Sequence, residues 1–262
     1  MEFAFDRGVA VRRIDAARWQ GEVEPRWNIG SAPNGGYLLC IALSALHESL
    51  PHPDPVAVSA HFPSRVSPGP VEVAVEPLRV GRGHSTAVAR LEQAGEPRVQ
   101  VTATFGDLGS LDGPTIVQAE RPDIPPPEAC IRAEGPVAPD FIKQFDMRLT
   151  PESAGFAVGL RSGRGVMEGW VRFADGREPD SRSLSLFADS FPPTMFHLME
   201  RIQWVPTIEL TVHGRGRPAP GWLQCRFLTR YVIGGYLEED GEIWDQTGRL
   251  VAMSRQLARV RD

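Results

Sequence analysis

The residues Asn34-Gly35-Gly36 come directly before a run of apolar residues, and this position suggests a substrate-binding site at the start of a helix. The N-terminus of a helix presents N–H groups that have no partner within the helix, together with the positive end of the helix dipole. Glycine has no Cβ, so a substrate carbonyl can approach the backbone closely there. We therefore predict substrate binding at Asn34, Gly35, Gly36 and Tyr37, with the N–H of Gly36, and with it Tyr37, contacting an oxyanion.

Several other kinds of active site lack the residues that they need. The sequence contains no G-x-S-x-G motif, which a serine nucleophile elbow would require. Residues 81–85, GRGHS, lack the GK[ST] ending of a phosphate-binding loop. The three cysteines, Cys40, Cys130 and Cys225, form no CxxC pair, and the six histidines show no metal-ligand spacing. We expect neither a metal nor any other cofactor.

The apolar run that begins at Gly36 predicts a helix that extends to about Ser49. Apolar side chains occupy nearly every side of this segment. Such a helix is normally surrounded by protein rather than laid on a surface.

Two segments after this helix alternate apolar and polar residues, the pattern of strands with one buried face. They cover residues 71–76 and 99–105, and a turn is expected at 93–96. No helical pattern separates the consecutive strands, which favours an antiparallel meander over a parallel sheet. A buried helix followed by such a meander predicts a sheet wrapped around a helix, the arrangement called the hotdog.

The second half of the chain repeats signals of the first half. Pro68-Gly69 recurs as Pro220-Gly221, and Gly95 recurs as Gly248, at offsets of 152 to 153 residues. A repeat of this length indicates duplication of a whole domain. The second helix is expected near 183–199, interrupted by Pro192-Pro193.

A proline-rich stretch separates the two halves. Residues 106–140 contain seven prolines and little periodicity, which indicates a surface linker. We predict an N-terminal hotdog domain over 1–110, a linker over 111–140 and a C-terminal hotdog domain over 141–262.

Three groups of residues resemble the acyl-CoA thioesterase II family in its broad, TesB-like sense. They are the segment WNIGSAPNGGYLLCIALSAL at 27–46, the meander that follows it, and LSLFADSFPP, TIELTVH and LVAMSRQLARV in the second half. The NGGY and ADxxPP elements together carry most of the specificity. The resemblance implies an α+β fold, a fused double hotdog with two antiparallel sheets, each wrapped around a central helix.

The resemblance also implies a catalytic trio of Asp, a hydroxyl residue and Gln in the second domain. These fall on Asp189 within FADSFPP, on Thr207, and on Gln256 within AMSRQLAR. The connection between Asp189 and the hydroxyl residue is shorter than in the family's better-known members, so Thr211 remains an alternative to Thr207.

Thioester hydrolysis needs an activated water, and Asp189 is the candidate base. Its apolar neighbours Phe187, Ala188 and Phe191 would raise its pKa by disfavouring the charged form. Thr207 and Gln256 would orient the water. Direct nucleophilic attack by Asp189 through a mixed anhydride is an open alternative.

The expected activity is thus hydrolysis of acyl-CoA to free acid and CoA. One rival is a hotdog enoyl-CoA hydratase, which would pair Asp189 with a histidine such as His197. Another is a protein that binds acyl-CoA or acyl-lipid without catalysis, because a fold does not fix a function.

The net charge and the distribution of apolar residues restrict the partners and the cellular location that we expect. The net charge of −5 argues against a nucleic-acid partner. The N-terminal residues show no apolar core of signal-peptide length, and no stretch approaches the roughly 20 apolar residues of a membrane span. We expect a cytoplasmic protein that forms at least a dimer, with acyl-CoA as its substrate.

Overall fold

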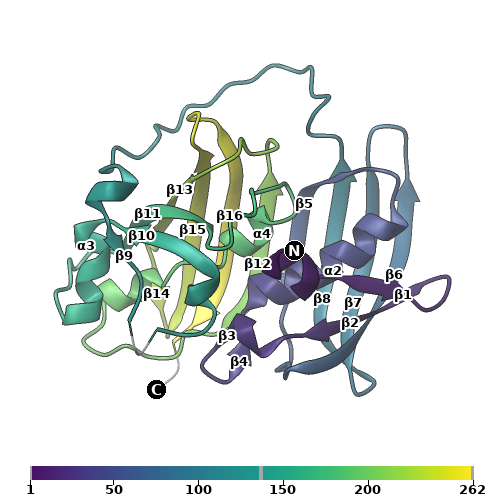
Figure 1. Ribbon diagram of the computed structural model, residues 1–262, viewed down its shortest axis with the longest axis horizontal. Coiled ribbons are helices and arrows are strands. Elements are labelled where there is room, and N and C mark those ends of the chain that lie inside the picture. Colours follow the sequence, from purple (N-terminus) through teal and green to yellow (C-terminus); the bar gives the residue numbers. More distant parts are fainter. Residues whose placement is uncertain (1, 136–137, 261–262) are drawn as a thin grey trace.

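The computed structural model describes residues 2–135 and 138–260, and most of its strands join one antiparallel sheet (Figure 1). The N-terminal half supplies β1 (Val11–Arg13), β2 (Arg18–Val23), β5 (Asp54–His61), β6 (Gly69–Val80), β7 (Ser85–Gln93) and β8 (Glu96–Gly106). The C-terminal half supplies β9 (Ile131–Arg132), β10 (Phe145–Leu149), β11 (Val166–Phe173), β12 (Thr207–Gly214), β13 (Leu223–Leu228), β14 (Val232–Ile233), β15 (Tyr236–Asp245) and β16 (Leu250–Arg259). A separate small pair consists of β3 (Asn28–Ile29) and β4 (Ala32–Pro33).

The helices are few, and only one of them is long. The α-helices are α1 (Ala4–Gly8), α2 (Gly35–Ser49), α3 (Pro151–Ala154) and α4 (Leu184–Phe187). The 3-10 helices are η1 (Pro25–Trp27), η2 (Pro127–Ala129), η3 (Ile142–Gln144), η4 (Gly155–Val158) and η5 (Thr194–His197). Among the residues that the structure describes, none of these helices is long and apolar enough to cross a membrane.

The order of the strands is nearly the same on both sides of one central pair. It runs β1-β2-β6-β7-β8-β5-β12-β16-β15-β13-β11-β10-β9, with β14 beside β15. From the central pair outward, β5-β8-β7-β6-β2 on one side matches β12-β16-β15-β13-β11 on the other. The expectation of two separate sheets was therefore wrong, because β5 and β12 pair antiparallel and join the halves into one sheet.

The turns that the repeat predicts have the backbone conformation that glycine favours. Gly95, between β7 and β8, has a φ of 78°, and Gly248, between β15 and β16, has a φ of 86°. Both values lie in the left-handed region, which side chains with a Cβ rarely adopt. The repeated glycines therefore close corresponding hairpins in the two halves.

The predicted buried helix is confirmed as α2. Asn34 caps it, because its side-chain Oδ1 accepts a hydrogen bond from the N–H of Tyr37 at 2.9 Å. Every residue from Gly36 to Leu46 is buried. The helix packs on strands β2 and β5 to β8 and also against α4 (Figure 1).

The second half has no counterpart of comparable length. Within the range 183–199 the chain forms only the four-residue α4 and the 3-10 helix η5, on either side of Pro192-Pro193. The predicted interruption is confirmed, since proline cannot donate to a helical hydrogen bond and its ring clashes with the preceding turn.

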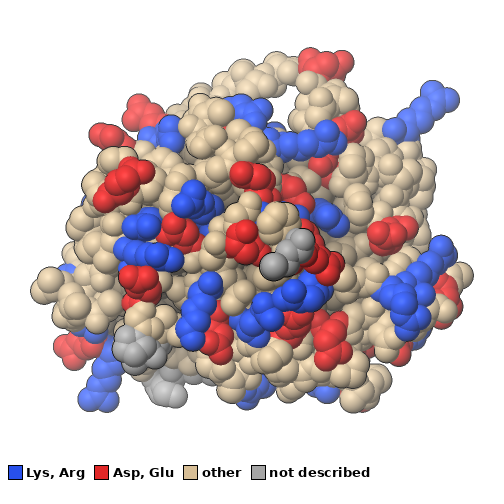
Figure 2. Space-filling model, in the orientation of Figure 1, with Lys and Arg blue, Asp and Glu red and all other residues tan. Residues whose placement is uncertain are grey.

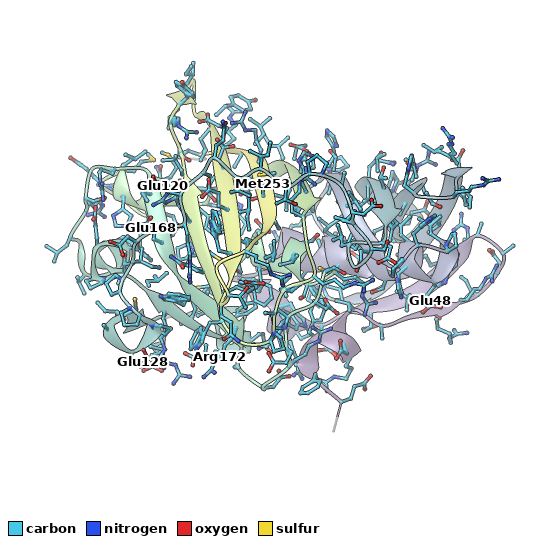
Figure 3. The ribbon with its side chains drawn as sticks, turned by 90° about the horizontal axis from the view of Figure 1, so that it is seen from above. Glu48, Glu120, Glu128, Glu168, Arg172 and Met253 are labelled. Atoms are coloured by element: carbon cyan, nitrogen blue, oxygen red, sulfur yellow. The ribbon has the colours of Figure 1, made fainter. Side chains whose placement is uncertain are left out.

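One hydrophobic core continues through both halves. The ring of Phe145, from the C-terminal half, has its centroid 6.2 Å from that of Trp27 in the N-terminal half and 5.8 Å from that of Phe187. The N-terminal helix α1 joins the C-terminal half, where Phe5 lies 5.2 Å from Phe173. Seen from above, the strands of the two halves lie side by side, with Glu48 at the far end of α2 and Met253 on β16 (Figure 3).

The stretch 111–140 is only partly free of regular structure. Its first residues are exposed and arch over one end of the molecule (Figure 1). Its later part contains η2 and β9, and β9 pairs with β10 of the second half.

The charged side chains of both signs are interspersed over the face shown in Figure 2.

Candidate active site

Asp189 lies just after α4, where its carboxylate faces the N-terminus of α2. Its Oδ2 accepts hydrogen bonds from the Gly36 N–H at 2.8 Å and from Asn34 Nδ2 at 2.9 Å. The same amide of Asn34 donates to the main-chain oxygen of Asp189 at 2.8 Å. The predicted glycine motif in one half thus holds the predicted carboxylate of the other half.

The glycines allow this close approach. A Cβ at Gly36 would lie 2.8 Å from the main-chain oxygen of Ser185 and 2.9 Å from Cβ of Asp189. A Cβ at Gly35 would lie 3.1 Å from Asp189 Oδ2. The N-terminus of α2 therefore reaches the carboxylate because its first residues carry no side chain.

Gln256 reaches the same carboxylate from the sheet, and Thr207 lies beside Gln256. Gln256 Nε2 donates to Asp189 Oδ1 at 3.3 Å and also to Thr207 Oγ1. The paired strands β12 and β16 bring these two residues together, because Thr207 lies opposite Ala258 in the register. Thr211 is engaged elsewhere, since its hydroxyl donates to Glu209 Oε1 at 2.6 Å. Thr207 is therefore the hydroxyl residue beside Gln256.

Burial makes Asp189 a stronger base than a carboxylate in water. Desolvation raises its pKa to about 6, while the hydrogen bonds from Gly36, Asn34 and Gln256 lower the pKa and offset part of that rise. The residue as a whole is partly buried. A carboxylate with a pKa near neutrality matches what a general base requires.

A second carboxyl group, which was not among the residues predicted from the sequence, lies opposite Gln256 in the sheet. Glu239 on β15 is buried, and its Oε2 accepts from the N–H of Thr194 at 2.9 Å and from the Thr194 hydroxyl at 2.8 Å. Desolvation is the largest cause of the rise of its pKa to about 7, and the charge of Asp189 adds to it. The sequence did contain a signal, because residues of β15 alternate between the two faces of the sheet and Glu239 falls on the same face as the buried residues Leu237 and Ile243.

The two N–H groups predicted to contact an oxyanion already have acceptors within the protein. The N–H of Gly36 already donates to Asp189, and the N–H of Tyr37 donates to the side chain of Asn34. The phenol of Tyr37 is buried, stacked on Trp27 at 5.1 Å, and donates to the main-chain oxygen of Gly8 at 2.8 Å. Each N–H carries a single hydrogen, so these groups position the carboxylate and the helix instead.

His197 lies away from Asp189. Its Nε2 donates to the Ser153 main-chain oxygen at 3.1 Å, and its Nδ1 accepts from the Ser162 N–H at 3.3 Å. Both ring nitrogens are used in packing the second half, so the Asp–His pair that a hydratase would need does not form. Within residues 2–135 and 138–260, no group of three or more His, Cys, Asp or Glu side chains is placed to hold a metal ion.

The whole chain is similar to known proteins. An uncharacterised protein of Mycobacterium bovis is 28% identical over 99% of each chain. The structure of a protein of Thermobifida fusca assigned to thioesterase II has a TM-score of 0.92, with 33% identity over 99% of this chain and 98% of that one. A protein of unknown function from Alicyclobacillus acidocaldarius, with 24% identity, 100% and 99% coverage and a TM-score of 0.91, shows that the fold is the hotdog.

Two family models match most of the chain, one for each half. The acyl-CoA thioesterase N-terminal domain matches residues 23–106, and the acyl-CoA thioesterase C-terminal domain matches residues 117–260. The second match alone covers more than half of the sequence. The chain therefore belongs to the acyl-CoA thioesterase family.

Proposed function

We propose that this protein hydrolyses acyl-CoA thioesters with a water molecule that Asp189 activates. The observation that carries the proposal is the convergence of three hydrogen-bond donors on one carboxylate whose pKa is about 6. Asn34 and Gly36 hold Oδ2 from the N-terminal half, while Gln256, in contact with Thr207, reaches Oδ1 from the C-terminal half.

The two carboxylate oxygens have different tasks in this mechanism. Oδ2 is fixed by two donors at 2.8 and 2.9 Å, whereas Oδ1 has the longer contact of 3.3 Å and is freer to accept another proton. A water beside Oδ1 and Thr207 gives up a proton to Asp189 as its oxygen attacks the thioester carbonyl. The C–S bond then breaks, and the proton passes to the departing thiolate, which yields the free acid and CoA.

We infer that the fold is a fused double hotdog, with units over 1–110 and 141–262. The mirrored strand order around β5 and β12 supports this arrangement. The first unit has α2 as its central helix, and the second has α4 and η5 in the same role. In this arrangement the active site lies between the units, because each contributes residues that contact Asp189.

Thiol release from short, medium and long acyl-CoAs tests the proposed function. We expect turnover by the wild type, a loss of about 10²- to 10⁴-fold in kcat for Asp189→Asn, and about 10²-fold for Gln256→Ala. Thr207→Val is compared with Thr211→Val, which changes the same residue type on the same strand. Only Thr207→Val is expected to lower kcat.

Each contrary result has a distinct meaning. Turnover that survives in Asp189→Asn, with the fold intact by circular dichroism, rejects this site. Absence of turnover in the wild type, with acyl-CoA binding still measurable by calorimetry, supports the binding protein instead.

A further inference from the structure

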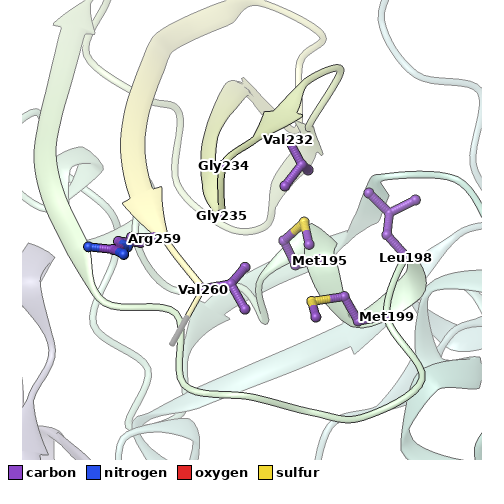
Figure 4. A pocket seen from close by; sticks show the side chains of 8 residues that line it. All are labelled: Met195, Leu198, Met199, Val232, Gly234, Gly235, Arg259 and Val260. Carbon is purple, nitrogen blue, oxygen red and sulfur yellow. The ribbon is translucent and has the colours of Figure 1, made fainter. Parts of the chain in front are cut away.

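A pocket of about 550 Å³ lies beside η5 in the second half and has no part in the hydrolysis described above (Figure 4). Its lining residues are mostly apolar: Met195, Leu198, Met199, Val232, Gly234, Gly235, Arg259 and Val260. The volume is within the range of small-molecule sites in proteins.

The pocket lies on the face of the sheet that carries Gln256. Alternate residues of a strand share a face, so Gln256, Ala258 and Val260 point the same way. On the neighbouring strand, Glu239 lies opposite Gln256, and Leu237 lies opposite Ala258. At about 3.3 Å per residue, Val260 at the pocket is roughly 13 Å from Gln256 along the strand.

Met195 lines the pocket and packs on Ala258 and Leu237, each two residues along its strand from Gln256 and Glu239. Its side chain is only 3% exposed and forms a small cluster with Leu237 and Ala258. Its backbone is held firmly, since the adjacent Thr194 donates twice to Glu239. Its side chain, by contrast, has three rotatable bonds and fills irregular gaps, which makes it suited to move for a flexible ligand.

We propose that this pocket receives the distal end of the substrate's acyl chain, and that Met195 determines how long a chain the enzyme accepts. This inference rests on the proposed function. An extended chain that leaves the thioester near Gln256 would pass over Ala258 and Leu237 and reach the pocket where Met195 now packs.

The chemistry of the lining favours an acyl chain over the phosphates of CoA. Figure 4 shows Met195, Leu198, Met199, Val232 and Val260 directed into the pocket, while the Arg259 side chain points away from it. The Arg259 guanidinium lies 5.0 Å from the centre of the Tyr236 ring instead. Among the described lining residues, no charged side chain faces the space, and burial of phosphates without a cation is costly.

Chain-length profiles of kcat/KM test the inference. Met195→Ala opens the path, and we expect it to raise the ratio of long-chain to short-chain kcat/KM by about tenfold or more. Val232→Trp fills the pocket from a partly exposed position and should lower that ratio by a similar factor. Leu257→Trp is the matched control, because it lies on the opposite face of β16 and should leave the ratio unchanged.

The outcomes separate this inference from the proposed function. If the wild type hydrolyses acyl-CoAs and both pocket variants keep its chain-length profile, the pocket does not hold the acyl chain. Val232→Trp decides the question even if Met195→Ala fails to fold. A wild type that hydrolyses no acyl-CoA of any length overturns the proposed function and this inference together.

Discussion

At the scale of single residues, Asp189 combines hydrogen-bond stabilisation with the cost of burial. Three donors contact its carboxylate, yet burial raises its pKa from 3.8 to about 6. Between these two values the folded state binds more protons at this group than the unfolded state does. The contribution of Asp189 to the free energy of unfolding therefore falls as the pH rises through this window.

Asp189→Asn should remove that loss of stability. The difference in the free energy of unfolding between variant and wild type should grow from about pH 4 upward and reach on the order of 2 to 3 kcal/mol in favour of the variant near pH 7. Urea unfolding of both proteins over this pH range measures the difference. Parallel stability curves would contradict the raised pKa.

The same pKa should appear in the kinetics. Only the carboxylate form of Asp189 accepts a proton from water, so kcat/KM should rise with pH through about 6 and then level off. The measurement is thiol release at substrate concentrations far below KM. An acid limb centred near 4, the ordinary value for a carboxyl in water, would show that burial does not tune this group.

At the scale of elements, the contact between α2 and α4 determines whether the site can form. A Cβ at Gly36 would lie 2.8 Å from the main-chain oxygen of Ser185, which cannot move without α4. A Cβ at Gly35 would meet the ring of Phe62 at 3.2 Å and the Asp189 side chain at 3.1 Å, and both groups are ends of side chains.

Gly36→Ala should therefore cost more than Gly35→Ala. We expect Gly36→Ala to lower the free energy of unfolding by about 1 to 3 kcal/mol and kcat/KM by more than tenfold, since overpacking pushes α2 and α4 apart. Thermal unfolding and thiol release measure the two effects. Gly83→Ala is the control, because a Cβ there has nothing within 4 Å. Equal behaviour of Gly36→Ala and Gly83→Ala would show that the contact tolerates a methyl group.

The elements also show what the sequence could predict. Local periodicity was sufficient for α2, β6 and β8, and the proline pair was sufficient for the break after α4. The pairing of β5 with β12 has no local signal, so the prediction of two sheets failed. For Tyr37, the pattern indicates a helix start but does not show that the side chain of Asn34 already accepts the hydrogen bond of its N–H. Glu239 was missed because an acidic residue in a strand usually indicates an exposed position.

At the scale of the whole molecule, neither half contains all the residues of the proposed site. Asn34 and Gly36 come from the first half, and Asp189, Thr207 and Gln256 come from the second. The halves are held by five residue pairs between β5 and β12 and by a hydrogen bond from Ser59 to Glu209 at 2.9 Å. The packing of Phe5 on Phe173 adds a further contact between the halves.

This shared construction predicts that the covalent connection between the halves is dispensable after folding. Gly113 is exposed, and a Cβ there would have nothing within 4 Å, so a protease site inserted after it should be cut without disturbing the core. The cut protein should migrate as one species in size-exclusion chromatography under native conditions and keep its kcat/KM within about twofold. The uncut insertion variant is the control. The contrary result would be separation of the two pieces without denaturant, together with loss of activity. It would mean that the linker, and not the joined sheet, holds the site together, because Asp189 would lose Gly36 and Asn34 as soon as the chain is cut.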